Sequence, residues 1–448
     1  MALSGYPSKV IVTVINLPFL IPLLALTASA QALFDPEAYR QLADASSAQT
    51  IAVRTTITVQ NWTTYRPFIA VGLRNAFSGK YPIRIGSEPL YVVEISPSQH
   101  FGQPRKFLED TEKYLGQAQL VQSLTGGFTL SPLPGQTAGL PFGPNPAEPN
   151  LALKVLYNYW LAYQPRISNA ISTTWSVDSS RNAGQHSTNI TAYRLSHLSA
   201  PGFPAALPYA QDYLSCQRNV VLTPEEKKYN TSLKLWYNDP VRIPELYSFV
   251  PSMRRSLRLS AAARCRPMGV TDFVEDDSGF QIPNFKATLL GVKKLIARIQ
   301  DPAKGFDPAA YDLTGSFPGW PNPGTGTWQV RDVYVVDVSP LPVMGSYCYS
   351  HKVLYIDKET WMALFSDSYD DSGKFWKLFW PKYAPMRVGD ALVLAAPAGL
   401  ASGEMLDFKK NHASVSIQND ITVDEKVPDS YQDAQRLAVP AGLNEVNQ

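Results

Sequence analysis

The sequence predicts an α+β fold, in which helices plug the concave face of one large, curved antiparallel sheet that forms an open half-barrel. The first observation is a series of strand-like segments that runs from Ile167 almost to the end of the chain. The second is that helical periods are nearly confined to the part before Ile167. A sheet of roughly ten sequential strands must close, split or curl. With few helices to cover a flat sheet, we expect it to curl around the early helices.

The composition suits such a fold and excludes one class of partner. The 448 residues include 40 Lys and Arg against 38 Asp and Glu, a net charge of +2. A protein that binds nucleic acid through a basic surface needs a larger excess of cations, so no nucleic-acid partner is expected. Charged residues make up only 17%, and 37 prolines accompany many Thr, Ser, Asn and Gln residues. This composition is typical of strands joined by ordered turns.

The N-terminus has the pattern of a secretory signal peptide. Lys9 precedes a long apolar run, which ends in two overlapping small-x-small triplets that close at Ala30 and Ala32. We therefore expect residues 1–30 to be a signal that is removed, by cleavage after Ala30 or Ala32. The alternative is a membrane anchor, because the run is just long enough to cross a bilayer. Two prolines within the run favour cleavage. The mature protein is then expected in the periplasm, where it could lie peripheral to the outer membrane.

Residues 31–448 are expected to form a single domain that begins with short elements. Asp35 followed by Pro36 is typical of a helix N-cap with proline at the first helical position, and this helix should run to about Ala48. The clearest amphipathic helix is predicted at 105–115. Its apolar face consists of Phe107, Leu108, Thr111, Tyr114 and Leu115. The other early elements are an alternating strand at 51–60, a helix at 67–77 stopped by Gly79, and a strand at 90–95.

Two segments rich in Pro and Gly, near 122–150 and 301–326, have the composition of loops or lids. Long loops of this kind are often functional. Between the first loop and the strand series, Asn150 is expected to cap a helix that is apolar nearly all round, ALKVLYNYWLAY. Such a helix is either buried or covers an apolar ligand. Burial in the core is the favoured interpretation.

Alternation along the strands assigns residues to the two faces of the sheet. In the segment SMRRSLRLS, Met253, Leu257 and Leu259 share one face, and Arg254 and Arg258 share the other. The apolar set is expected to face the interior. The two arginines are expected on the outer side, where a membrane surface or a partner protein could contact them. The strands are predicted at 171–177, 190–195, 232–237, 247–250, 253–259, 285–299, 327–338, 347–356, 361–365 and 374–380, with two further short strands at 391–396 and 414–417. A turn at 370–373 is expected to join the strands at 361–365 and 374–380.

Aromatic and apolar residues on these strands are the candidates to line a ligand cavity on the concave face. For any single residue, an ordinary core position is the favoured alternative. The candidates are Trp236, Met253, Leu257, Leu259, Trp328, Tyr334, Tyr355, Trp361 and Trp376.

The cysteines and acidic residues give little support for chemistry at a reactive site. Cys216, Cys265 and Cys348 allow one intramolecular disulfide in an exported protein. Cys265 and Cys348 lie beside strand-like segments and are the favoured pair. Because the sequence has no C-x-x-C or H-x-x-x-H spacing, neither a metal nor a cofactor is expected. Catalytic motifs are also missing, and Asp276 and Asp277 precede Ser-Gly in an apparent turn, where solvent-exposed turn residues are the favoured interpretation.

Several motifs together resemble one known family. They are LVQSLTGGF, LPFGPNPAEPN, YSFVPSMRRSLRLS, TDFVEDDSGF, ATLLGVKKLI, RDVYVVDV and SYCYSHKVLYIDKETWMALFSDSYDDSGKFWK. The family is that of the domain of unknown function 1329, and the last motif, with Tyr355, Asp357, Thr360, Trp361, Asp370 and Gly373, is the most specific. The resemblance implies a relation to the outer-membrane lipoprotein-sorting (Lol-type) carriers, an open curved sheet with helices at its mouth, and an apolar cavity for acyl chains. It also implies a link to resistance-nodulation-division-type exporters. It carries over no catalytic residue.

The favoured function is that of an exported periplasmic protein, not an enzyme, which binds or carries a lipid or other hydrophobic molecule and serves a membrane exporter or an outer-membrane protein. The alternative is a scaffold partner of a membrane exporter, whose cavity is filled by its own Trp and Tyr side chains. A hydrolase that uses Asp276, Asp277 or Cys348 is the least favoured hypothesis.

Overall fold

The computed structural model describes residues 32–78, 93–178, 183–260, 264–268, 271–299, 326–395 and 400–447. The chain divides into two units, Met1–Ala30 and Gln31–Gln448, and the fold below is that of the second unit. Several predictions lie outside the described residues: the signal peptide, the helix stop at Gly79, the beginning of the strand at 90–95, and almost all of the loop at 301–326.

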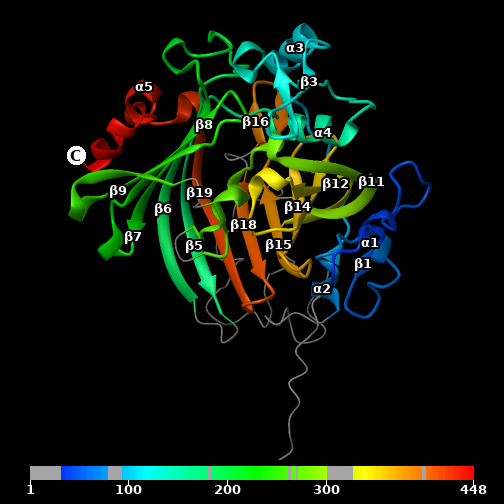
Figure 1. Ribbon diagram of the computed structural model, residues 1–448. Helices are drawn as coiled ribbons and strands as arrows, with labels where there is room; N and C mark the ends of the chain where they lie inside the picture. Colours follow the sequence, from blue (N-terminus) through cyan, green and yellow to red (C-terminus); the bar gives the residue numbers. More distant parts are fainter. Residues whose placement is uncertain are drawn as a thin grey trace, which may run out of the picture. The chain divides into compact units, whose positions relative to one another are not determined.

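One antiparallel sheet of 13 strands dominates the second unit (Figure 1). Its strands are β5 (Ile167–Val177), β6 (Ala183–Arg194), β7 (Tyr213–Thr223), β8 (Thr231–Tyr237), β9 (Glu245–Val250), β10 (Arg255–Leu259), β11 (Phe285–Ile299), β12 (Thr327–Pro340), β13 (His351–Asp357), β14 (Ala363–Tyr369), β15 (Phe375–Tyr383), β18 (Leu400–Asp407) and β19 (His412–Val423). Their order is β10-β9-β8-β7-β6-β5-β19-β18-β15-β11-β12-β13-β14, and β14 also pairs with β15. Sequential neighbours therefore pair within β5–β10 and within β11–β15, as the strand series predicts.

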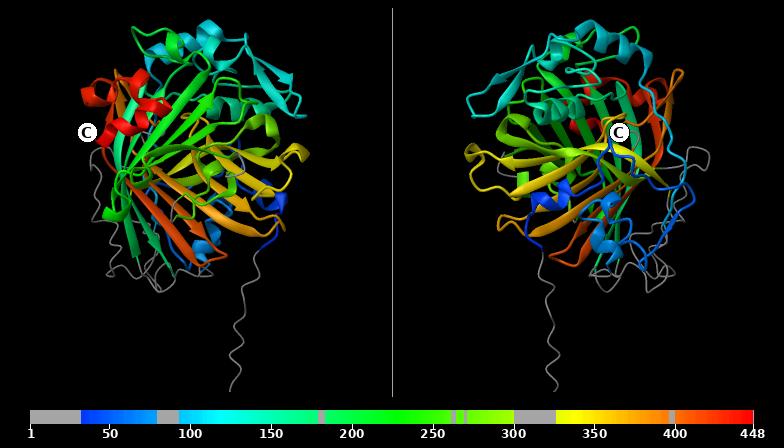
Figure 2. Two further views of the ribbon diagram at one scale, coloured as in Figure 1. Left: turned by 60° about the vertical axis from the view of Figure 1, so that its left-hand side comes forward. Right: turned by 90° about the vertical axis from the view of Figure 1, so that its right-hand side faces the viewer.

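The sheet is strongly curved but does not close into a barrel (Figure 2). At one edge, β10 pairs with β9 alone among the described strands. At the other end, β11 to β15 curl until Ile299 of β11 meets Tyr383 of β15 in a single parallel pairing. Gly291 assists the bend, because the β11–β12 register shifts there and its φ of 145° is one that glycine adopts readily. The predicted fold class, a large curved antiparallel sheet with few helices, is confirmed.

Residues 264–268 and 271–284, which follow β10 and precede β11 in the sequence, lie over one face of the sheet, which we call the inner face. Lys352 of β13 forms an ion pair with Asp277 (2.8 Å). Lys377 of β15 donates a hydrogen bond to the carbonyl oxygen of Asp272 (2.5 Å). The segment between the two halves of the strand series therefore serves as a cover for this face.

The N-terminal segment 32–78 covers the opposite face of β13 and β14. The hydroxyl of Tyr39 donates to Asp367 of β14 (3.0 Å), and the backbone N–H of Val71 donates to the hydroxyl of Tyr355 of β13 (2.8 Å). Because both faces are covered, β14 is buried along its whole length. This explains why its sequence lacks the alternation of a half-exposed strand.

The helices are few and short, and two of them lie together at one end of the sheet. These two are α3 (Arg105–Tyr114) and α4 (Leu151–Trp160), and the views in Figure 2 place both at the same end. No helix within the described ranges is long and apolar enough to cross a bilayer. The remaining small elements are α1 (Pro36–Arg40), α2 (Arg74–Phe77), α5 (Ala434–Leu437), and the strand pairs β1 (Thr56–Ile57) with β2 (Val93–Glu94), β3 (Gln119–Gln122) with β4 (Phe128–Ser131), and β16 (Met386–Val388) with β17 (Ala391–Val393).

The C-terminal region covers the outer face of β6 to β9. Leu437 of α5 and Leu443 are buried in one apolar cluster with Leu233 and Leu235 of β8 and Phe249 of β9. This cluster is separate from the main core, which lies between the helices, segment 32–78 and the rest of the sheet.

The N-terminal segment departs most from the sequence prediction. The helix that begins after Asp35 ends at Arg40 and not near Ala48. Of the strand predicted at 51–60, only Thr56–Ile57 is a strand. Its backbone forms local turns, and at a few places it bonds to distant parts of the chain: Phe34 donates to Gly373, Ala45 to Val292, and Arg54 to Ile95. Such contacts override weak local preferences, which are all that the sequence pattern reports.

Two predicted helices are also adjusted. The helix predicted at 67–77 is split into a 3-10 turn at Arg66–Phe68 and α2. Helix α3 confirms the one predicted at 105–115, but Leu108 and Leu115 of its expected apolar face are exposed.

The strand series is confirmed and extended. Strands β7 and β18 were not predicted, whereas β11 has the predicted bounds and the turn at 370–373 joins β14 to β15. Helix α4 is buried as expected and begins after Asn150, but the side chain of Asn150 makes no capping hydrogen bond and its φ is 63°. The loop at 122–150 is ordered and includes β4.

A candidate ligand pocket beside helix α4

A pocket of about 190 Å³ lies between the C-terminal end of α4, strands β6 to β8, and residues 279–282 of the segment that covers the inner face. Tyr159 and Trp160 form the α4 side, and Met362, just before β14, and Tyr383 of β15 also line the pocket. Sites for drug-sized ligands commonly occupy about 300–1,000 Å³, whereas a cavity of about 150 Å³ can hold benzene. The pocket therefore suits a small molecule, or one short part of a larger one.

The strand wall of the pocket follows from the alternation of side chains. Ala192 and Arg194 of β6 lie two residues apart, and so do Ser215 and Gln217 of β7. The register pairs Ala192 with Gln217, Arg194 with Ser215, and Ser215 with Trp236 of β8. Residues that face each other in a ladder share one face of the sheet. These five side chains consequently form a single wall.

The opposite wall approaches Trp236 closely because a glycine stands at the contact. Gly279 has a φ of 143°, and a Cβ atom on it would lie 3.1 Å from the Trp236 ring. Any side chain here would be strained and would push the segment outward. Phe280 follows and packs edge-on against Phe285 at the start of β11 (ring centroids 5.0 Å apart).

The lining is mostly neutral. Burial raises the pKa of the Tyr159 and Tyr383 hydroxyls, so both stay protonated near neutral pH, and Tyr383 donates to the Ala363 carbonyl (3.0 Å). The side chain of Cys216 lies in the apolar cluster on the outer face, and burial there raises the pKa of its thiol and disfavours the reactive thiolate. The described lining contains neither a carboxylate nor a histidine. This arrangement is suited to binding an apolar group and offers no acid–base pair.

Arg194 is the one charged residue of the described lining. Its side chain is at the end of β6 and only 4% of the residue's surface is exposed. Its guanidinium makes one long hydrogen bond, to Oε1 of Gln164 (3.4 Å). Burial lowers the pKa of Arg194 to about 9. The group is therefore still charged at neutral pH.

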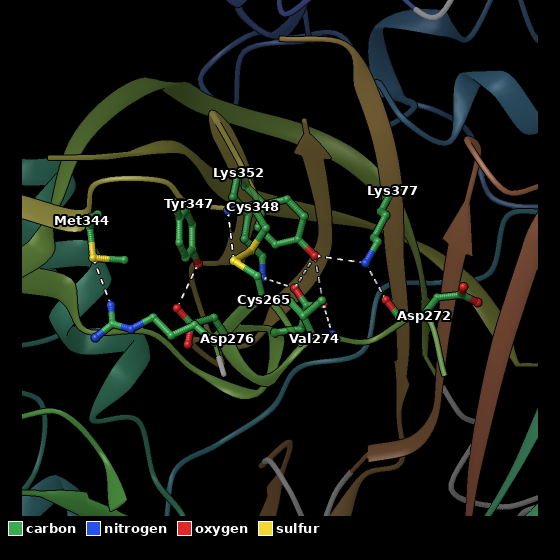
Figure 3. Close-up of a disulfide and its surroundings, with 12 residues drawn as sticks. Cys265, Asp272, Val274, Asp276, Met344, Tyr347, Cys348, Lys352 and Lys377 are labelled. Atoms are coloured by element: carbon green, nitrogen blue, oxygen red, sulfur yellow. Dashed lines mark hydrogen bonds and ion pairs between the residues drawn. A yellow bond between two sulfur atoms is a disulfide. The ribbon is translucent and has the colours of Figure 1, made fainter. Parts of the chain in front are cut away.

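A disulfide ties the segment that covers the inner face to the start of β13. It joins Cys265 to Cys348, the pair favoured by the sequence, with the Cα atoms 5.5 Å apart (Figure 3). Nearby, the Arg264 guanidinium donates to Oε1 of Gln281 (2.6 Å). The same segment continues into residues 279–282, so these contacts fix one wall of the pocket.

Asp276 and Asp277 are not the solvent-exposed turn residues that the sequence suggested. The Tyr347 hydroxyl donates to Asp276 (3.0 Å; Figure 3). Asp277 is paired with Lys352. Burial by itself would raise the pKa of Asp277, but Lys352 and Lys377 outweigh it and lower the pKa. Both carboxylates thus hold the segment on the sheet. The local sequence around Asp276 and Asp277 could not reveal these interactions, because the partner residues come from β13, β15 and the residues before β13.

A second buried polar cluster lies beneath the N-terminal segment and was not foreseen. Asp367 accepts hydrogen bonds from the Tyr39 hydroxyl (3.0 Å), the Tyr355 hydroxyl (2.9 Å) and the Gly72 N–H (3.0 Å) at one carboxylate oxygen. Burial raises the pKa of Asp367 to about 6. A Cβ on Gly72 would lie 2.2 Å from the other oxygen, so the close approach requires glycine. Tyr355, a predicted cavity residue, therefore belongs to a core cluster.

The other aromatic candidates occupy different places. Trp236 lines the pocket. Trp328 is buried against Trp380 (ring centroids 5.4 Å apart), and Tyr334 is stacked on Trp361 (5.7 Å), so all four rings fill the core. Trp376 is half-buried and donates to Asp407 (3.0 Å). The described pocket lining does not include these residues other than Trp236.

The candidates near β10 lie at an edge of the sheet. The register across β8, β9 and β10 puts Leu257 and Leu259 on the inner face and Arg258 on the outer face, where it pairs with a glutamate of β9 (2.9 Å). Met253 differs from the prediction, because it lies in a 3-10 turn before the strand and is 51% exposed. Arg254 ends that turn with a φ of 48°, so the alternation that was assigned to both residues begins only at Arg255. None of these residues lines the described pocket.

The described part of the chain also contains no group of His, Cys, Asp and Glu side chains that could hold a metal ion.

The fold places the chain in the class of open, curved antiparallel-sheet proteins with helices packed against the sheet, and the site adds a small pocket between sheet and helix. Within that class, the chain belongs to the family described as "Protein of unknown function (DUF1329)", which matches residues 56–437. The resemblance inferred from the sequence motifs is confirmed. No match was found among curated proteins.

Three solved structures resemble the chain at low identity. A Vibrio parahaemolyticus domain described as an outer membrane lipoprotein-sorting protein is 12% identical, with a TM-score of 0.45, and the match covers 65% of this chain and 99% of that one. A DUF1329 family protein from Desulfovibrio piger is 11% identical, with a TM-score of 0.43 and coverage of 63% and 95%. A LolA superfamily protein from Nitrosomonas europaea is 13% identical, with a TM-score of 0.37 and coverage of 62% and 96%.

Proposed function

We propose that the protein is an exported, periplasmic binding protein that shelters a small hydrophobic molecule in the pocket beside α4. The observation that carries this proposal is the pocket itself, whose lining combines large apolar and aromatic side chains with a smaller polar set. The apolar and aromatic residues include Tyr159, Trp160, Trp236, Phe280 and Met362, and the polar ones are Gln164, Ser168, Arg194, Ser215 and Gln217. Burial of an apolar surface contributes about 25 cal/mol per Å². Binding of this kind needs no covalent step, and the described lining offers no acid–base pair for one.

The volume of the pocket restricts the ligand. A space of about 190 Å³ takes roughly one aromatic ring or a short alkyl chain. A lipid with long acyl chains would require α4 or residues 279–282 to move away from the sheet. We therefore infer that the bound group is small, or that only one end of a longer molecule enters. Delivery of this molecule to an exporter or to the outer membrane is part of the proposal and rests on the predicted signal peptide and the family resemblance.

Filling the pocket is expected to abolish binding. Ala192 lies in the middle of the strand wall, so Ala192→Phe places a ring in the pocket. We expect the affinity for 1-octanol, measured by quenching of tryptophan fluorescence and by native mass spectrometry, to fall at least tenfold. Gln185→Phe is the matched control, because Gln185 is exposed on the same strand and does not line the pocket. Equal binding by both variants, or no binding by the unchanged protein, would contradict the proposal.

A scaffold partner of a membrane exporter is the second candidate. The observation that favours it is that most of the aromatic residues expected to line a cavity, such as Trp328, Tyr334, Tyr355 and Trp361, fill the core. The two candidates differ in the effect of Ala192→Phe in cells. A ligand carrier loses its function when the pocket is filled, whereas a scaffold keeps it and still co-purifies with its membrane partner.

A further inference from the structure

The position of Arg194 sets it apart from the other charged residues in the interior. Alternation along β6 places its side chain on the same wall as Ala192, facing the pocket beside α4. Ser215 stands directly opposite in the β6–β7 register and lines the pocket too. The guanidinium is thus part of the pocket and not of the protein surface, since only 4% of Arg194 is exposed.

Arg194 also differs from several other buried cations in lacking a counter-charge. Arg298 pairs with Glu404 (2.6 Å), Arg331 with Asp357 (2.7 Å), and Lys352 with Asp277 (2.8 Å). Among the described residues, Arg194 has no carboxylate within ion-pair distance, and its single side-chain partner is the neutral Gln164.

The described neighbourhood supplies no counter-charge. The charge of Arg194 helps to lower the pKa of His197, after burial, which is the larger cause. His197 is itself buried between the carbonyl oxygens of Pro134 and Gly139 (3.2 and 2.7 Å). A buried charge is normally paired, because removing it from water is unfavourable. The fold therefore maintains an uncompensated cation at the wall of an apolar pocket.

We propose that this pocket binds an anionic amphiphile, with an oxyanion head group on the Arg194 guanidinium and an apolar part against Trp236, Phe280 and Tyr159. Arginine presents a planar fork of N–H donors that matches a carboxylate or a phosphate. The Ser215 hydroxyl can donate to the same head group. This inference rests on the proposed binding function and specifies its ligand class. Burial lowers the pKa of Arg194 only to about 9, so the anchor is cationic at periplasmic pH values near 7.

The test compares three ligands that share one alkyl chain. Octanoate, octyl phosphate and 1-octanol are titrated into the mature protein by isothermal calorimetry, together with Arg194→Gln, Arg194→Lys and Arg166→Gln. Arg166 is the matched control, because it is a neighbouring arginine that stacks on Phe203 and does not line the pocket. We expect the unchanged protein to bind at least one of the two anions at least tenfold more tightly than 1-octanol. The tighter of the two anions indicates whether the head group is a carboxylate or a phosphate.

The variants separate anchoring from folding. Arg194→Gln should lose the preference for the anion and bind 1-octanol as before, whereas Arg194→Lys and Arg166→Gln should keep the preference. Without ligand, Arg194→Gln should have a Tm no lower than that of the unchanged protein, because no ion pair is lost; a purely structural arginine would lower it. Equal affinities for anions and 1-octanol, or a preference for the anion that survives Arg194→Gln, would contradict the role of Arg194 as an anchor for the head group. The proposal that the pocket binds a hydrophobic molecule would still stand. Failure of all three ligands to bind would overturn the binding function as well.

Discussion

Loss of the Cys265–Cys348 disulfide is expected to lower the free energy of unfolding by about 4.5 kcal/mol. The bond joins residues separated by 83 positions. In the chain-entropy description, a cross-link that closes a loop of about 15 residues contributes about 3 kcal/mol, and one of about 100 residues about 4.7 kcal/mol. The measurement is urea unfolding of the unchanged protein and of the Cys265→Ser, Cys348→Ser double variant, each with and without a reducing agent.

The third cysteine supplies the control. Cys216 is a buried free thiol on β7, so Cys216→Ala removes a cysteine without removing a cross-link. Reductant should destabilise the unchanged protein and Cys216→Ala by the same amount and should leave the double variant unaffected. An unfolding curve of the unchanged protein that does not respond to reductant would show that the bond is absent or contributes nothing. The disulfide matters for the site because the segment it fastens continues into the pocket wall at residues 279–282.

The second large effect is a pH dependence of stability that comes from Asp367. Its folded pKa of about 6 lies above the usual carboxyl value because the group is buried. Below about pH 4 the carboxyl is protonated in both states. As the pH rises, the unfolded chain releases this proton first, so the free energy of unfolding falls until the pH passes about 6. A shift of about two pKa units corresponds to about 3 kcal/mol.

Other carboxylates also titrate in this range, so the prediction is stated as a difference between variants. Relative to Asp367→Asn, which cannot titrate, the unchanged protein should lose about 3 kcal/mol between pH 4 and pH 7 in chemical denaturation. Tyr355→Phe removes a hydrogen bond that favours the carboxylate, and it should move the fall in stability to higher pH. Parallel pH profiles for the unchanged protein and Asp367→Asn would rule out the raised pKa.

The strands that the sequence predicts well are those whose pattern is set by their own residues. β11 is long, apolar residues recur along it between its charged ones, and its bounds at Phe285 and Ile299 coincide with the prediction. The turn at 370–373 is equally local, since its Asp and Gly residues favour a tight reversal. Family motifs in the same region supported the fold class. Local patterns and fold agree there, as they do in most well-determined parts of proteins.

The elements that escaped prediction depend on distant partners. β7 reads YLSCQRNVVLT, with Arg218 and other polar residues among apolar ones, and it becomes a strand between β6 and β8. Segment 32–78 has short helical and strand-like patterns, but it is shaped by contacts such as those of Tyr39 and Gly72 with Asp367. These contacts join residues about 300 positions apart, and no local rule reports them.

The candidate site was only partly accessible from the sequence. Trp236 was a candidate because aromatic residues on strands can line a cavity, and it does line the pocket. The other aromatic candidates were chosen for the same reason but lie in the core. Alternation along a strand predicts which face of the sheet a side chain is on, but it does not predict which segment packs over that face. Arg194 had no signal at all, because a single arginine at the end of a strand is ordinarily solvent-exposed. Its burial and its lack of a carboxylate partner emerge only from the packing of α4 and residues 279–282 against β6 and β7.

A crystal structure of residues 31–448 with the tighter-binding of octanoate and octyl phosphate would test the central claim most directly. We predict electron density for the ligand in the pocket beside α4, with its anionic head group within hydrogen-bond distance of the Arg194 guanidinium and its alkyl chain against Trp236 and Phe280. A pocket that stays free of ligand at saturating concentrations of both anions, or ligand bound only elsewhere on the protein, would contradict the claim that this pocket is the binding site.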